Sequence, residues 1–113
     1  MKKSFTIPIY NQPIVFTDSI EDAKKHCKPK DREDVEWFEM SEVDSAGFTL
    51  VDKDCKIVIC IQDPNDVGNL VHEITHATIF TLLSRDVGVT LEQNEAFCYL
   101  NGYLMEKWME LMW

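Results

Sequence analysis

The sequence predicts an α+β fold in which a short antiparallel sheet packs on two long helices. Two runs rich in β-branched residues, 48–51 and 56–61, flank the polar residues 52–54, which is typical of a β-hairpin. Two later stretches, 66–85 and 90–109, repeat apolar residues at the spacing of a helix. Strands followed by helices, rather than alternating with them, favour an α+β arrangement.

Composition and charge limit the partners that we expect. The chain has 113 residues, enough for one hydrophobic core, so we expect a single domain over residues 1–113. A formal net charge of -9 disfavours nucleic acid, because an acidic surface repels phosphates. The apolar runs are too short to span a membrane, and polar residues interrupt the amino-terminal run before a signal peptide develops. We therefore expect a cytoplasmic protein that does not bind membranes.

The first part of the chain predicts two short strands and a short helix. Residues 4–10 and 13–16 are apolar or alternating, which indicates two strands or one interrupted strand. Residues 17–19 suit a helix start, and Pro29 suits its end. One apolar stripe of this helix would consist of Ile20, Ala23 and Cys27. Residues 36–40 fit either a helical turn or a strand.

The motif His72-Glu73-Ile74-Thr75-His76 lies in the first long helix. At 3.6 residues per turn, His72 and His76 share one face, so both imidazoles can bind one metal ion. Glu73 is within reach of a water molecule on that ion. Two nitrogen ligands, an open coordination position and a carboxylate that accepts the water's proton are what metal-assisted peptide hydrolysis needs.

The residues around the motif predict that its helix is mostly buried. The apolar stripe consists of Val67, Leu70, Val71, Ile74, Ala77, Thr78 and Leu82. A buried polar group without a partner costs about 1–3 kcal/mol, and a metal ion bound by the motif would remove that cost. Asn65 or Asp66 suits the N-cap of this helix.

A catalytic zinc ion usually takes three protein ligands, and we expect the third from the next helix. That helix is predicted to begin at Thr90, with Gln93 completing a capping box. Glu95 is favoured as the third ligand, because the chain between the helices can bring it back to the metal. Glu92 is the alternative, although in the first turn it already complements the helix dipole. Cys98 offers a thiolate in place of the carboxylate, or is simply buried.

These features resemble the gluzincin type of zinc metallopeptidase, with its HExxH helix followed by Asn-Glu on the next helix. More narrowly, residues 47–59, the motif and residues 94–100 are similar to small zincin-like proteins encoded by phages and prophages. The ImmA/IrrE-like group is their better-described relative. The resemblance covers roughly residues 46–105. It differs at Cys98 and Tyr99, where gluzincins commonly have a small residue and an aspartate that supports the first histidine.

The resemblance implies a small zincin-like metallopeptidase with a protein or peptide substrate, in the host cytoplasm if the protein is phage-encoded. The implied zinc ligands are His72, His76 and Glu95, and the implied base is Glu73. Zinc would lower the pKa of its water toward about 7 and polarise the carbonyl, while Glu73 would remove the proton and return it to the leaving amine. The peptide would lie along residues 56–61, if that strand is an exposed edge.

Two other functions fit the same residues. The first is a non-catalytic or regulatory zincin-like binding module, of phage or prophage origin, that keeps a zinc ion or only the scaffold. The second is a structural protein without a metal, in which the histidines only pack. Tyr99 and Tyr103 are candidates for stabilising an oxyanion, or else core residues. The sequence leaves the oligomeric state open.

Overall fold

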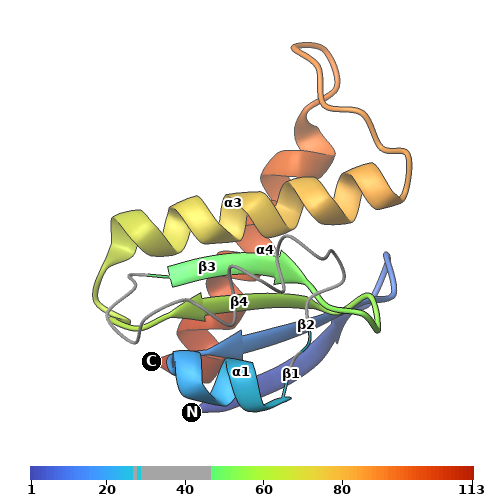
Figure 1. Ribbon diagram of the computed structural model, residues 1–113. Coiled ribbons are helices and arrows are strands. Elements are labelled where there is room, and N and C mark those ends of the chain that lie inside the picture. Colours follow the sequence, from blue (N-terminus) through green and yellow to red (C-terminus); the bar gives the residue numbers. More distant parts are fainter. Residues whose placement is uncertain (27, 29–46) are drawn as a thin grey trace.

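The computed structural model describes residues 1–26, 28 and 47–113. In chain order the elements are β1 (Lys2–Ile7), β2 (Gln12–Thr17), α1 (Ile20–His26), β3 (Gly47–Val51), β4 (Ile57–Ile61), α3 (Val67–Ser84) and α4 (Glu95–Met112) (Figure 1). The predicted strands and the short helix are confirmed. Cys27, Pro29 and the ambiguous run 36–40 lie outside the described residues.

The four strands form one mixed sheet in the order β1-β2-β4-β3. β1 pairs with β2 and β3 pairs with β4 in antiparallel hairpins. In the middle, however, β2 and β4 are parallel, with Ile14 opposite Ile57. The prediction of an antiparallel sheet is therefore wrong at this pair. Parallel neighbours need a crossover connection, and α1 lies in the connection between β2 and the second hairpin.

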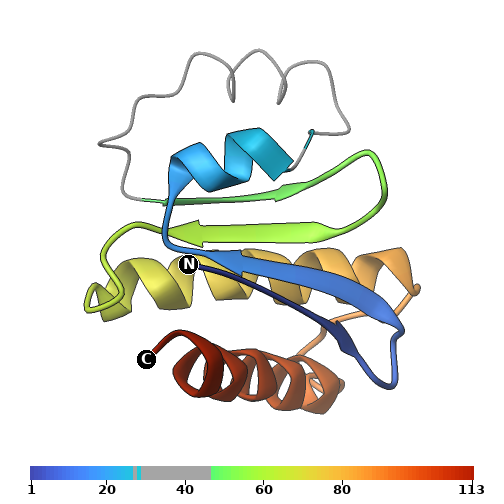
Figure 2. The same ribbon diagram turned by 90° about the horizontal axis from the view of Figure 1, so that it is seen from below.

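Helices cover both faces of the sheet (Figure 2). α1 lies on one face, where Ile20 and Ala23 pack with Val58 and Cys60 of β4. α3 and α4 lie on the other face, and their buried residues pack with alternate residues of the same strand. All five residues of β4 are buried, because helices cover this apolar strand on both faces.

α4 supplies the largest buried side chain of the core. Trp108 is fully buried, and its ring lies 4.9 Å from that of Phe16 on β2. Leu100 and Leu104 are buried on the same face, as their helical spacing predicts. At the end of α4, Trp113 Nε1 donates to the backbone oxygen of Pro64, 3.0 Å away, and so ties this end to the entry of α3.

α3 begins where the sequence predicts but is less buried than expected. Asp66 is the N-cap, and its carboxylate accepts a hydrogen bond of 3.1 Å from the backbone of Asn69. Val67 and Val71, predicted in the apolar stripe, are 49% and 39% exposed. The buried face consists of Leu70, Glu73, Ile74, Ala77, Thr78, Thr81 and Leu82. One side of α3 therefore faces solvent.

α4 begins at Glu95, five residues after the predicted start at Thr90. The Thr90 hydroxyl does accept a hydrogen bond from the backbone of Gln93, as in a capping box. The backbones of these two residues also bond to each other in both directions, at 3.2 and 3.3 Å. This reciprocal pair closes a local turn, so the helix cannot begin at Thr90. The connection between α3 and α4 projects from the body of the domain (Figure 1).

Within the described residues, the helices lack the combination of length and apolar character that crossing a membrane requires.

Candidate metal centre

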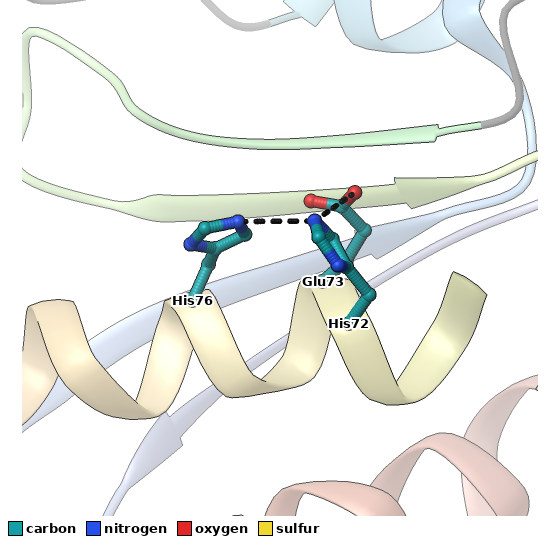
Figure 3. Close-up of side chains that lie close together, drawn as sticks. All are labelled: His72, Glu73 and His76. Carbon is teal, nitrogen blue, oxygen red and sulfur yellow. Dashed lines mark hydrogen bonds and ion pairs between the residues drawn. The ribbon is translucent and has the colours of Figure 1, made fainter. Parts of the chain in front are cut away.

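The three motif side chains come together on α3 on the side that faces β3 and β4 (Figure 3). The Nε2 atoms of His72 and His76 are 3.2 Å apart, and the two rings are nearly perpendicular at 79°. Glu73 Oε2 lies 3.9 Å from His72 Nε2. One ligand atom from each residue lies within 4.8 Å of the others, so these residues form the cluster that the spacing predicts.

The two histidine nitrogens fit a zinc ion. Zinc binds histidine nitrogen at about 2.0–2.1 Å, so two such ligands at a tetrahedral angle stand roughly 3.3 Å apart. The observed separation of 3.2 Å agrees with that value. The same separation also suits a hydrogen bond between a protonated and an unprotonated ring nitrogen. The geometry therefore fits zinc without requiring it.

The burial of the cluster differs from the prediction. The side chain of His72 is 65% exposed and His76 is also exposed, whereas the side chain of Glu73 is only 10% exposed. Water can hydrogen-bond to both imidazoles. The expectation that the histidines are buried and therefore need a metal ion is wrong. The reason is the orientation of α3, which turns Leu70 and Ile74 into the core and leaves the histidines accessible to solvent.

Glu73 has a partner that the sequence analysis missed. Thr49, in the middle of β3, places its hydroxyl oxygen 2.8 Å from Glu73 Oε1 and 2.9 Å from the backbone oxygen of Glu73. Alternation along β3 buries Phe48 and Leu50 and turns Thr49 the other way, toward α3. That alternation is visible in the sequence, but nothing in the sequence indicates which helical residue Thr49 meets.

Glu95 lies outside the cluster. It is the exposed first residue of α4 and lines a hollow of about 450 Å³ together with Asp86 and Glu92. Neither Glu95 nor Glu92 belongs to the cluster of possible metal ligands that the described residues form. The assignment of Glu95 as the third zinc ligand therefore stays a prediction, and Glu92 stays its alternative.

The packing of α4 explains this separation. Thr78 on α3 donates a hydrogen bond of 2.8 Å to Asn101 on α4. At about 100° per residue, Thr78 points roughly 120–160° away from the two histidines around the helix. The two long helices therefore pack on each other, but α4 contacts a different face of α3 from the one that carries the imidazoles.

The tyrosines proposed for an oxyanion lie elsewhere. Tyr99 and Tyr103 line an apolar groove of about 710 Å³ together with residues of the turn between β1 and β2. Tyr103 packs edge-on against Phe5 of β1, at 6.4 Å between ring centroids. β1 and β3 are the two outer strands of the sheet, and the motif lies beside β3. This position does not favour the oxyanion role that the sequence left open for the two tyrosines, and Tyr99, which is 75% exposed, is not a core residue either.

The three cysteines of the described residues, Cys55, Cys60 and Cys98, do not join the cluster. Cys98 is exposed on α4. Cys60 is fully buried in β4, and burial, with smaller contributions from Asp18 and Glu73, raises the pKa of its thiol to about 12. At neutral pH Cys60 therefore remains a protonated thiol, which is a poor zinc ligand.

Compared with models of protein families, with curated proteins and with solved structures, the chain shows no match. The geometry of the cluster is therefore what indicates a function for this protein.

Proposed function

We propose that this protein is a zinc-dependent metallopeptidase that hydrolyses peptide bonds in a protein or peptide substrate. The observation that supports this function is the convergence of the His72 and His76 Nε2 atoms, 3.2 Å apart, beside the carboxylate of Glu73. A hydrolytic zinc site uses nitrogen ligands for the ion and a neighbouring carboxylate as the base. Zn²⁺ is the proposed cofactor, with Glu95 as the third protein ligand.

The motif residues have separate roles in this proposal. His72 and His76 hold the ion through Nε2. A bound zinc ion supplies Lewis acidity, which acidifies water and polarises the substrate carbonyl. Glu73 accepts a proton from the attacking water and gives it to the leaving amine. Its Oε2 already lies on the side of the imidazoles, 3.9 Å from His72 Nε2, so α3 does not have to rearrange.

The strand proposed to bind the peptide has to be reassigned. From the sequence, the peptide was expected along residues 56–61 if that strand were an exposed edge. β4 is instead flanked by β2 and β3 and is fully buried. That prediction is wrong. Among the described strands, β3 is the outer one on this side of the sheet, and its Thr49 contacts Glu73. We place an extended substrate along β3, where backbone pairing would bring the scissile bond next to the motif.

One observation favours a second function, a zinc-binding or regulatory module without turnover. Within the described residues, only His72, Glu73 and His76 come together as possible metal ligands. Glu95, which would complete a catalytic zinc site, does not belong to this cluster. A binding module would retain the metal but would not cleave peptides. Zinc content and peptide hydrolysis, measured on the same samples, separate the two functions.

The test compares the parent protein with His72→Ala and Glu73→Gln, using elemental analysis and hydrolysis of fluorescein-labelled casein. We expect about one zinc per chain in the parent and in Glu73→Gln, and little in His72→Ala. Hydrolysis should fall by on the order of a hundredfold or more in Glu73→Gln. Glu106→Gln makes the same chemical change in an exposed residue of α4 and is the matched control.

Each result has a clear consequence. Zinc in the parent without hydrolysis would favour the binding module. No zinc in the parent, even after zinc is supplied, would favour the structural protein in which the histidines only pack. Full activity in Glu73→Gln would exclude Glu73 as the base.

A further inference from the structure

The contact between β3 and Glu73 joins an outer strand to the proposed base. Thr49 and Glu73 are 24 residues apart in the sequence, and their side chains meet at 2.8 Å. Glu73 is the buried member of the motif, with a side chain that is 10% exposed against 65% for His72. A carboxylate in such a position needs a hydrogen-bond donor, because leaving it unpaired is costly. Thr49 is the donor that the structure provides.

This contact distinguishes the two oxygens of the Glu73 carboxylate. Oε1 faces the Thr49 hydroxyl, and Oε2 faces His72 at 3.9 Å from Nε2. The hydroxyl has a single proton, and its two neighbours, Oε1 and the backbone oxygen of Glu73, belong to the same residue. Only the hydrogen bond to Oε1 holds the carboxylate itself, because the one to the backbone oxygen leaves the Glu73 side chain unrestrained.

Close packing at the start of β3 supports the same contact. A methyl group at Gly47 would lie 2.5 Å from the backbone oxygen of Cys60 and 3.0 Å from Asn69 Nδ2, one turn before Glu73 on α3. β3 therefore approaches the beginning of α3 closely at Gly47. Two residues later, and on the same side of the strand, Thr49 is within hydrogen-bonding distance of Glu73.

We propose that Thr49 is a positioning residue, whose hydroxyl holds Oε1 of Glu73 so that Oε2 faces the space beside the two imidazoles, where the attacking water loses its proton. This inference rests on the proposed peptidase function. The hydrogen bonds of the Thr49 side chain both go to Glu73, so in this proposal Thr49 acts through Glu73. β3 then has two functions, because the strand that orients the base is also the one along which we place the substrate.

The first test uses zinc-free protein and needs no activity. Thr49→Val keeps the branched shape of the side chain and removes the hydroxyl, and Glu73→Ala removes the carboxylate. A double-mutant cycle of the unfolding equilibrium, with both single variants and the double variant, isolates the interaction. A hydrogen bond to a charged group predicts a coupling of about tenfold in the equilibrium constant. Additive effects would overturn the proposed contact.

The second test measures kcat and KM of the zinc-loaded protein with labelled casein. Thr49→Val should lower kcat by about tenfold or more with KM and zinc content nearly unchanged, because a misdirected base affects the proton transfer and not binding. Thr49→Ser retains the hydroxyl and should keep kcat within about threefold. Val51→Thr, on the same side of β3, controls for a general effect of substitution in this strand.

The outcomes separate this inference from the proposed function. An active parent whose kcat is unchanged in Thr49→Val would overturn the role of Thr49 and leave the peptidase standing. A zinc-loaded parent without turnover would overturn the peptidase and, with it, the positioning role. Loss of kcat in Thr49→Val, with recovery in Thr49→Ser, would support both.

Discussion

The two helices that carry the predicted metal ligands begin in different ways. α3 follows β4 after a short loop, and the side chain of Asp66 caps it. α4 follows a projecting connection in which Asp86 has a φ of 56° and Leu91 is 94% exposed, and its N-cap Asn94 makes no capping hydrogen bond through its side chain. The position of His72 relative to His76 depends on α3 alone. The position of Glu95 relative to the two histidines depends also on the connection between α3 and α4.

The largest effect is expected for Gly47→Ala, which tests how closely β3 packs against β4 beside the beginning of α3. The added methyl would lie 2.5 Å from the backbone oxygen of Cys60, and that oxygen cannot turn aside as a side chain would. We expect the free energy of unfolding to fall by about 1–3 kcal/mol in urea denaturation of the zinc-free protein.

Gly102→Ala is the matched control for this prediction. Gly102 is an exposed residue inside α4, and a methyl group there would meet no atom within 4 Å. Alanine should therefore stabilise the helix, by about 0.5–1 kcal/mol. Equal stability of the two variants would show that the approach at Gly47 is not tight.

A second prediction concerns the third ligand. If Glu95 binds zinc, Glu95→Ala should weaken zinc affinity by about tenfold or more, because a charged ligand is lost. Glu92→Ala should leave the affinity unchanged. Competition with a chromophoric chelator measures both, and His72→Ala gives the loss expected for a motif ligand. Equal affinities of Glu95→Ala and the parent would exclude Glu95, and equal affinities of both variants and the parent would exclude Glu92 as well.

The smallest effect is expected at the helix starts. Asp66→Ala removes the acceptor of the 3.1 Å hydrogen bond from the Asn69 backbone and should cost about 1 kcal/mol of unfolding free energy. Asn94→Ala should cost under about 0.5 kcal/mol, because the Asn94 side chain makes no capping hydrogen bond. Thermal unfolding of the zinc-free variants measures both. A larger loss of unfolding free energy for Asn94→Ala than for Asp66→Ala would contradict this prediction, because it would show that α4 depends more on its N-cap side chain than α3 does.

Local patterns were sufficient for most of the fold. The hairpin of β3 and β4 follows from two β-rich runs around a polar turn, and the buried face of α4 follows from the spacing of Leu100, Leu104 and Trp108. The parallel pairing of β2 with β4 was not predictable in this way, since it joins strands that are not consecutive in the chain. The start of α4 was misplaced because Thr90 and Gln93 also form a turn when no helix follows.

In the candidate site, the sequence by itself determined that His72 and His76 lie side by side. Backbone hydrogen bonds fix the pitch of a helix, so residues four apart meet whatever surrounds them. Only the tertiary structure decided that Glu73 is buried against Thr49, that the histidines face solvent and that Glu95 lies outside the cluster. The physical reason is that these three features depend on contacts between separate elements, which no local periodicity encodes.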